Sequence, residues 1–331
     1  MVSKTSSRMP PSEKKLRALS RKATSRKSRS SLPAIDFSVV FRFGRAGLYL
    51  LAAAAGSYIS QLSLSPVYGD IPSSLYHDRI VNSLFILAWL LKGFLPQFKF
   101  SAWIPVLVLY TPAILHYVFR FSTEWGAING PVFTEALTYY PALFLSVYAA
   151  ATLMHQQSII LDIIPATASF ALFSTARSTI PRLLWNHIGS SWVLTRCGLH
   201  HLLGGFYAIL SPSILLFTAT GALFHSANSN TMCVFTPALN QTLATYNHTL
   251  IARHESNTGY VSVLENFEAG YRMMRCDHSL LGGEWQHTPA GLEHLNYENF
   301  KEPIYAIFVI LEAVRLVEPA PKNPKPRALA M

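Results

Sequence analysis

A series of apolar runs fills the middle of the sequence, from about Arg45 to His225. Each run is close to the roughly 20 residues that an α-helix needs to cross a lipid bilayer. The runs are continuous and show no period-2 alternation, so they predict helices rather than strands. The sequence therefore predicts a mainly α protein, a polytopic transmembrane helical bundle with about six spans, at residues 47–64, 81–95, 102–119, 137–153, 159–173 and 199–223.

The overall composition agrees with burial in lipid. Half of the 331 residues are hydrophobic and only 13% are charged, and the mean hydropathy is +0.27. A single soluble domain of this size is usually less apolar. We therefore expect an integral, multi-pass membrane protein in contact with the bilayer, in an organelle that the sequence does not indicate.

The positive charge is concentrated at the N-terminus. Of the formal net charge of +10, nearly all comes from the first 30 residues, where ten Lys and Arg residues face a single acidic residue, Glu13. Residues 1–30 alternate Ser, Thr, Lys and Arg with almost no apolar side chains, which predicts a disordered basic tail; we place its boundary before the first run, at 1–44. A basic segment beside a first span typically stays cytoplasmic and contacts anionic phospholipid. We favour that interpretation over a nucleic-acid arm, and no nucleic acid is expected as a partner.

Sequence features disagree about which side of the membrane holds the C-terminal segment. A cytoplasmic tail followed by six crossings returns the segment after His225 to the cytoplasm, and this is the placement we expect. The loop at 176–197 carries three arginines and would then lie outside, against the positive-inside tendency. Asn240 and Asn247 each begin an Asn-x-Thr acceptor for N-glycosylation, whose use would place the segment in a lumen.

Ionisable residues in or beside the runs raise the alternative of a metal or proton-relay site. The candidates are His116, His155, Asp162, His200 and His201. No His or Glu spacing repeats on facing helices, as metal sites in helical bundles need, so we expect hydrogen-bonded structural groups and no metal. The three cysteines, Cys197, Cys233 and Cys276, form no CxxC pair and indicate neither a zinc site nor a disulfide framework.

The last third of the chain has a different pattern. A β-rich segment at 259–266, a turn at 267–270 that ends in Gly270, and a returning segment at 271–277 predict a β-hairpin. Gly282 and Gly283 are expected to break the second strand, and residues 304–317, between two prolines, are expected to form a buried helix. The predicted domains are a basic tail at 1–44, a transmembrane domain at 45–225, a hairpin-and-helix segment at 226–318 and a Pro/Lys-rich tail at 319–331.

Three short motifs in this segment resemble those of a known enzyme family. They are Asn257-Thr258-Gly259-Tyr260, the stretch from Arg272 to Asp277, and Glu302-Pro303-Ile304-Tyr305. Aminopropyltransferases, the spermidine/spermine synthase family, open with a small β domain carrying a Ser/Thr-x-Tyr-Gln motif and an Arg-x-x-x-Leu-Asp-Gly turn, followed by a helix that begins with an aromatic-Tyr pair. The chain resembles in particular the membrane-anchored spermidine-synthase-like proteins of fungi.

The resemblance implies roles for four residues. Tyr260 and Tyr305 would line a substrate cleft, while Asp277 and Gly270 would shape the hairpin turn. A purely structural interpretation, in which both tyrosines are core aromatics, has equal weight.

The departures from the family pattern bear on activity. Val261 replaces the family Gln, His278 replaces the Gly after the turn Asp, and Ala306 stands where the family has His or Gln. The family's glycine-rich cofactor loop and catalytic Asp belong to a Rossmann-like domain. Residues 319–331 do not show the strand, glycine-rich turn and helix with which such a domain begins.

The resemblance therefore implies a membrane-tethered protein that is inactive alone. It would have no catalytic residue and no cofactor, and decarboxylated S-adenosylmethionine would be a co-substrate only if the catalytic domain were present. The alternative is a non-enzymatic transporter or scaffold, and a homo-oligomer is possible in either case.

Overall fold

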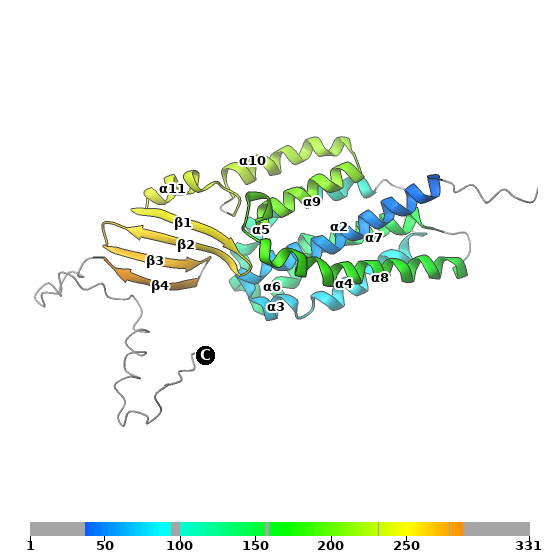
Figure 1. Ribbon diagram of the computed structural model, residues 1–331, viewed down its shortest axis with the longest axis horizontal. Coiled ribbons are helices and arrows are strands. Elements are labelled where there is room, and N and C mark those ends of the chain that lie inside the picture. The colour runs from blue at the N-terminus through cyan, green and yellow to red at the C-terminus, as the bar shows by residue number, and fades with distance from the viewer. Residues whose placement is uncertain (1–36, 94–99, 156–158, 231, 278, 287–331) are drawn as a thin grey trace, which may run out of the picture. The chain divides into compact units, whose positions relative to one another are not determined.

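The computed structural model describes residues 37–93, 100–155, 159–230, 232–277 and 279–286, without the side chains of 159–161 (Figure 1). The chain divides into two compact units, residues 1–43 and 44–331. The described part of the first unit is 37–43, which begins helix α2. The other described elements belong to the second unit.

Helices account for most of the described residues up to Ala244, in agreement with the mainly α prediction. Several begin with proline in their first turn, as α5 and α11 do, where the missing N–H costs nothing. The helices are α2 (Phe37–Tyr68), α3 (Asp70–Ser74), α4 (His77–Leu91), η1 (Phe100–Trp103), α5 (Ile104–Val118), η2 (Phe119–Phe121), α6 (Ser122–Leu137), α7 (Tyr139–Leu153), α8 (Ile159–Leu184), η3 (Trp185–His187), η4 (Trp192–Leu194), α9 (Arg196–Leu210), η5 (Ile214–Ala219), α10 (Thr220–Asn228) and α11 (Thr236–Ala244).

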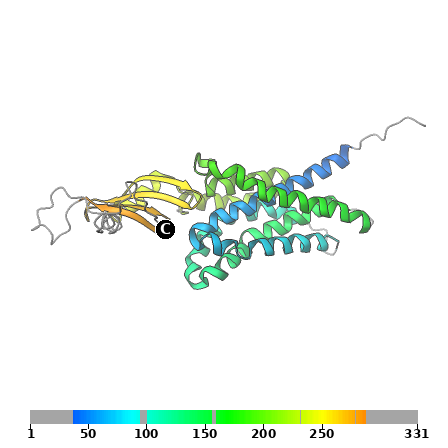
Figure 2. The ribbon, with the colours of Figure 1, turned by 60° about the horizontal axis from the view of Figure 1, so that its bottom comes forward.

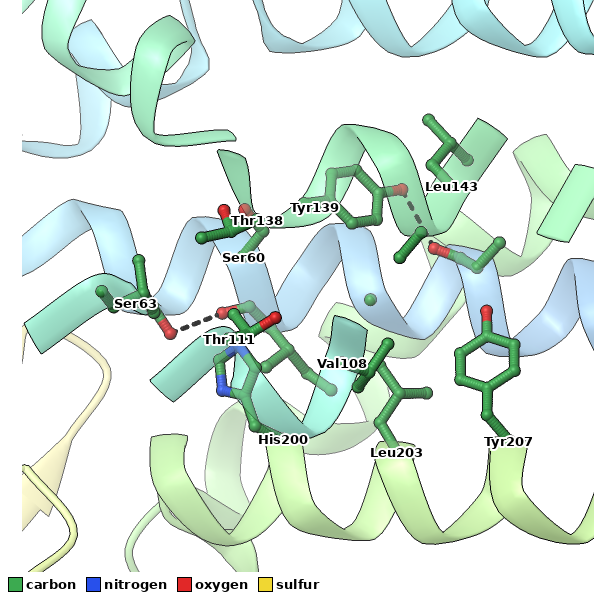
Figure 3. A pocket seen from close by; sticks show the side chains of 15 residues that line it. Ser60, Ser63, Val108, Thr111, Thr138, Tyr139, Leu143, His200, Leu203 and Tyr207 are labelled. Carbon is green, nitrogen blue, oxygen red and sulfur yellow. Dashed lines mark hydrogen bonds between the residues drawn. The ribbon is translucent and has the colours of Figure 1, made fainter. Parts of the chain in front are cut away.

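Small residues on α2 let its neighbours approach closely. Ala53 is buried, and its carbonyl accepts a hydrogen bond of 3.0 Å from the hydroxyl of Tyr139 on α7. A Cβ added at Gly56 would lie 3.1 Å from the Tyr139 ring, so glycine permits this contact. The cavity left between α2, α5, α7 and α9 is about 20 Å³, room for roughly one water molecule (Figure 3).

Two helical stretches among the described residues, Phe37–Tyr68 and Phe100–Leu137, are long and apolar enough to cross a membrane. The prediction of about six spans is therefore wrong. Helices α4 and α7 have 15 residues each, about 22 Å at 1.5 Å per residue, which is shorter than the hydrocarbon core. The run at 199–223 is divided between α9, η5 and α10. Helix α8 is long, but Ser, Thr and Arg residues along it lower its hydropathy.

Integral membrane location stays a prediction that rests on these two stretches. In the first, 33% of the most apolar window is buried inside the protein, against 56% in the second, so the first leaves more apolar surface for lipid. We expect the chain to remain in the membrane pellet after extraction with carbonate at high pH. Release into the supernatant would contradict the prediction, and a peripheral membrane protein serves as the control that must be released.

The described strands form one antiparallel sheet with the order β1-β2-β3-β4, and they follow one another without crossing (Figures 1 and 2). They are β1 (His248–Ser256), β2 (Gly259–Asn266), β3 (Tyr271–Cys276) and β4 (Ser279–Trp285). Helix α11 packs along β1, as Figure 1 shows. Gly259 and Gly270, at the turns before β2 and β3, have φ of +134° and +71°, values that glycine adopts without strain.

The predicted hairpin is present as β2 and β3, but it is the centre of a larger sheet. Strands β1 and β4 were not predicted, so a sheet of four strands replaces the lone hairpin. The prediction that Gly282 and Gly283 break a strand is also wrong. Both lie within β4, opposite Met274 and Met273 of β3, and the strand bulges next to them.

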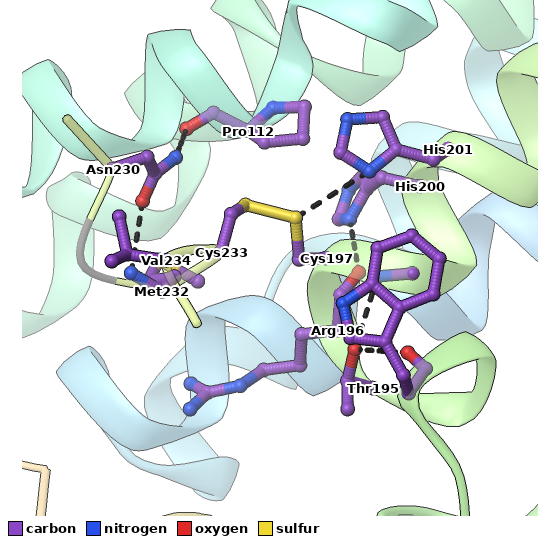
Figure 4. Close-up of a disulfide and its surroundings, with 12 residues drawn as sticks. Pro112, Thr195, Arg196, Cys197, His200, His201, Asn230, Met232, Cys233 and Val234 are labelled. Atoms are coloured by element: carbon purple, nitrogen blue, oxygen red, sulfur yellow. Dashed lines mark hydrogen bonds between the residues drawn. A yellow bond between two sulfur atoms is a disulfide. The ribbon is translucent and has the colours of Figure 1, made fainter. Parts of the chain in front are cut away.

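A disulfide joins Cys197, in the first turn of α9, to Cys233, before α11, with the Cα atoms 5.4 Å apart (Figure 4). The sequence indicated no disulfide framework, because the two cysteines lie 36 residues apart without a spacing motif. Asn230 helps to position the second cysteine, since its side chain donates to the Pro112 carbonyl at 2.8 Å and accepts from the Met232 N–H at 3.0 Å.

Several predictions concern residues outside the described part. They are the basic tail up to residue 36 and its contact with anionic phospholipid, the helix at 304–317 with Tyr305, and the Pro/Lys-rich tail at 319–331. These stay predictions, as does a homo-oligomer. Residues 37–44, which the prediction placed in the disordered tail, instead form the start of helix α2.

Candidate substrate site at the junction of helices and sheet

Arg196 is the centre of a buried ion cluster that joins α9 to the sheet. Arg196 is only 2% exposed, as is Glu255 on β1. The backbone N–H and Nε of Arg196 both donate to Glu255 Oε1, at 2.7 and 2.8 Å. Its terminal nitrogen donates to Asp277 Oδ2 at 3.2 Å. The carboxylate of Glu255 thus lies at the positive end of α9, where the helix dipole favours a negative charge.

Local sequence explains why this contact forms. Thr195 caps α9, its side chain accepting from the Gly198 N–H at 3.1 Å, so the helix begins at Arg196. Gly189 lies against the same strand, and a Cβ there would come within 2.0 Å of the Glu255 carbonyl. Gly189 also has φ of +79°, so this approach of the two backbones requires glycine.

Tyr260 on β2 lies between two guanidinium groups. The Arg253 and Arg196 carbons are 3.8 and 4.7 Å from the centre of its ring, in the geometry of cation–π contacts. Its hydroxyl donates to the Met232 carbonyl at 2.7 Å. Burial, and after it the negative charge of Glu255, raises the pKa of Tyr260, so the phenol stays protonated. Burial also lowers the pKa of Arg253.

Tyr260 and Asp277 are brought together by the sheet register. The Tyr260 N–H donates to Asp277 Oδ2 at 3.2 Å, and the Asp277 N–H donates to the Tyr260 carbonyl at 2.9 Å. Asp277 adopts φ of +45° just after β3, which fits a residue at a turn. Gly270 lies in the turn before β3, and its carbonyl accepts from the Gln286 N–H at 2.7 Å. Whether Tyr260 contacts a substrate stays a prediction.

A pocket of about 490 Å³ opens on one side of Tyr260, within the size range of small-ligand sites. Its polar lining is mostly basic, since four arginines face it together with Asp277 and His116. The arginines are Arg120, Arg196, Arg253 and Arg275. Guanidinium groups bind carboxylates and carbonyl oxygens well, so this pocket suits a ligand that carries such groups.

A second pocket, of about 220 Å³, shares Met232, Arg253 and Tyr260 with the first. Glu255 lines it, and Glu255 Oε2 is buried without a hydrogen-bond partner among the described residues. A buried carboxylate oxygen without a partner is costly unless a cation or donor binds it. Trp192 and Phe235, with ring centres 6.1 Å apart, stack at this pocket and are 54% and 59% exposed.

The ionisable residues predicted inside the apolar runs do not gather in one site, although His155 and Asp162 are neighbours. Asp162 pairs with Lys92 at 2.8 Å and lies 3.4 Å from His155 Nδ1. His200 Nδ1 lies 2.8 Å from the Arg196 carbonyl, and His201 Nδ1 lies 3.5 Å from the Cys197 sulfur. Among the described residues, no group of three His, Cys, Asp or Glu side chains could hold a metal ion.

Sequence reasoning missed a buried polar network around Glu135, on α6. Glu135 is 1% exposed and accepts from Ser60 at 2.7 Å and from Tyr140 at 2.7 Å. Its oxygens lie 2.8 and 2.9 Å from His77 Nδ1, and Ser57 Oγ lies 2.7 Å from His77 Nε2. An acidic residue within an apolar stretch is the signal that indicates such a network.

The described residues thus form a helical protein whose antiparallel sheet is joined to it by a buried ion cluster flanked by two pockets. The chain is similar to the N-terminal histidine N-methyltransferase of Emericella nidulans, with 38% identity over 294 residues, covering 83% of this chain and 51% of that protein. The chain therefore spans about half the length of the curated relative it matches. No protein-family model and no solved structure matches it.

This similarity overturns the resemblance to aminopropyltransferases. The relative is a methyltransferase, so the predictions of a spermidine-synthase-like protein, of a role in polyamine synthesis and of a transporter or scaffold are wrong. The first two motifs that carried the resemblance are parts of the antiparallel sheet. Asn257 and Thr258 form the turn between β1 and β2, and the stretch from Arg272 is strand β3. The third motif lies outside the described residues.

Proposed function

We propose that this chain takes part in the N-methylation of an N-terminal histidine, and that the two junction pockets hold the first residues of the protein substrate. The observation that carries the reaction is the 38% identity, over 83% of the chain, to a relative named for that activity. The charges at the junction support the binding of a substrate there.

An N-terminal histidine carries an ammonium group close to an imidazole ring. Glu255 Oε2, buried and without a partner among the described residues, would accept a hydrogen bond from the ammonium. The exposed faces of Trp192 and Phe235 line the same pocket and would pack against the imidazole. The smaller pocket therefore matches the amino-terminal residue.

The larger pocket matches the second and later residues of the substrate. Arg120, Arg253 and Arg275 line it and would bind backbone carbonyl groups or acidic side chains of those residues. Because Tyr260 and Arg253 belong to both pockets, a peptide would pass from one to the other across the Tyr260 ring.

The methyl donor would need a binding site of a different kind. A nucleotide-linked donor is typically held where a parallel strand leads through a glycine-rich turn into a helix. The described strands are all antiparallel, and none of them leads into such a turn. The described residues therefore do not fit a donor site, and we assign them the acceptor side only.

The proposed activity is tested in cells that make the protein. Deletion of the gene should abolish methylation of N-terminal histidines, measured by mass spectrometry of intact protein termini, and re-expression should restore it. Unchanged methylation after deletion would show that the proposal is wrong.

Binding to the purified chain tests the proposed site. A peptide that begins with histidine should bind at least tenfold more tightly than its N-acetylated form, because acetylation removes the charge that Glu255 would pair with (roughly 1.4 kcal/mol per tenfold). Trp192→Ala should weaken binding several-fold. Leu281→Ala, an exposed change on β4 that lines neither pocket, serves as the matched control. Equal affinity for the free and the acetylated peptide would exclude Glu255 as the ammonium site.

A further inference from the structure

Two asparagines near the start of the sheet have the sequence of N-glycan acceptors, but the structure distinguishes them. Asn247, in Asn-His-Thr, is exposed and lies at the turn between α11 and β1 with φ of +60°. Its side-chain nitrogen donates to Glu268. Asn240, in Asn-Gln-Thr, is half-buried on α11, and its Oδ1 accepts from the Leu250 N–H at 2.9 Å, beside the bulge in β1.

The disulfide supplies an independent indication of the compartment. Cys197 and Cys233 are bonded, and Cys233 lies 14 residues before Asn247 in the sequence. Structural disulfides form and persist in oxidising compartments and are rare in the cytosol. The enzymes that attach N-linked glycans work in such a compartment, the lumen of the secretory pathway. A bonded cysteine pair and an exposed acceptor therefore favour the same side of the membrane.

We propose that Asn247 carries an N-linked glycan and that the sheet and the disulfide lie in the lumen of the secretory pathway. Asn247 Nδ2 forms a bond to the anomeric carbon of an oligosaccharide carried on a lipid diphosphate. The bond from that carbon to the diphosphate breaks, the lipid diphosphate leaves, and Nδ2 loses one proton. The hydrogen that remains on Nδ2 still allows the bond to Glu268.

Asn240 is not modified in this proposal. Its side chain is half-buried, and its oxygen satisfies the N–H of Leu250, where the pairing of β1 with β2 is irregular. A bulky glycan at this position would have to pass between α11 and β1, which are in contact. The lumenal placement departs from the cytoplasmic one that the basic tail favours, because a bonded cysteine pair constrains the compartment directly whereas loop charge only biases topology.

The full-length chain, expressed in a eukaryotic cell, provides the test. Its mobility on a denaturing gel should increase by one step on treatment with a peptide N-glycosidase. Asn247→Gln should remove that step, Thr249→Ser should retain it because the acceptor sequence survives, and Asn240→Gln should leave it unchanged. Absence of any mobility step, or a step lost only in Asn240→Gln, would overturn the proposal.

Thiol labelling gives a second measurement that does not depend on a variant. Denatured without reductant, the chain should react with a thiol reagent at one cysteine, Cys276, and at all three after reduction. Three reactive thiols before reduction would contradict placement in an oxidising lumen.

Discussion

Replacement of Arg196 by methionine is expected to destabilise the protein by about 3–5 kcal/mol, the cost of leaving a buried charge without its partner. Glu255 is 2% exposed; it would lose the guanidinium that donates to its Oε1 and keep the hydrogen bond from the backbone N–H of residue 196. For a protein of this size the midpoint of thermal unfolding should fall by on the order of 10 °C. Circular dichroism of the purified chain in mild detergent measures the change.

Two further variants make this prediction specific. Arg196→Met combined with Glu255→Met should recover much of the loss, since a buried ion pair replaced by apolar groups is often nearly neutral. Arg272→Met removes an ion pair with Glu265 in which the arginine is 41% exposed, and should cost less than about 1 kcal/mol. Equal losses from Arg196→Met and Arg272→Met would mean that the junction contributes no more than the surface pair.

Replacement of Glu135 by leucine is expected to cost a similar amount, about 3–5 kcal/mol, for a different reason. The change would leave Ser60, His77 and Tyr140 buried without the acceptor that they share. Each orphaned donor carries a desolvation penalty of roughly 1–3 kcal/mol. The same thermal unfolding measurement applies.

A graded series separates charge from hydrogen bonding at Glu135. Glu135→Gln keeps one acceptor oxygen and should lose less stability than Glu135→Leu. Glu124→Gln, at an exposed position in the first turn of the same helix, should have almost no effect. If Glu135→Leu unfolds at the same temperature as the unaltered chain, the buried network does not stabilise the fold.

The sequence predicted local structure better than it predicted how the parts come together. Strand β2 was predicted because its sequence, GYVSVLEN, is rich in residues that favour strands, and β3 was predicted as the segment that returns after a turn ending in Gly270. Strand β1 was missed because its sequence, HTLIARHES, is largely polar. In β4 the two glycines suggested a break, whereas pairing with β3 determines the structure there.

Long-range contacts could not be predicted from one sequence. Arg196 and Glu255 are 59 residues apart, and Cys197 and Cys233 are 36 apart, so no local pattern links them. The apolar runs predicted the positions of helices well, but apolarity alone does not distinguish a core helix from a membrane span. The packing of α4 against α7 and of α5 against α9 buries much of the surface that suggested six spans.

The disulfide has a practical consequence for making this protein. It closes a loop of 36 residues, which by loop-closure entropy stabilises the folded state by roughly 4 kcal/mol. It also fixes the segment at Met232, whose carbonyl holds the Tyr260 hydroxyl between the two pockets. Production in a reducing bacterial cytosol is therefore expected to yield chains in which the segment at Met232 and the two pockets beside it are less firmly held. An expression host that oxidises thiols is the appropriate choice for functional work.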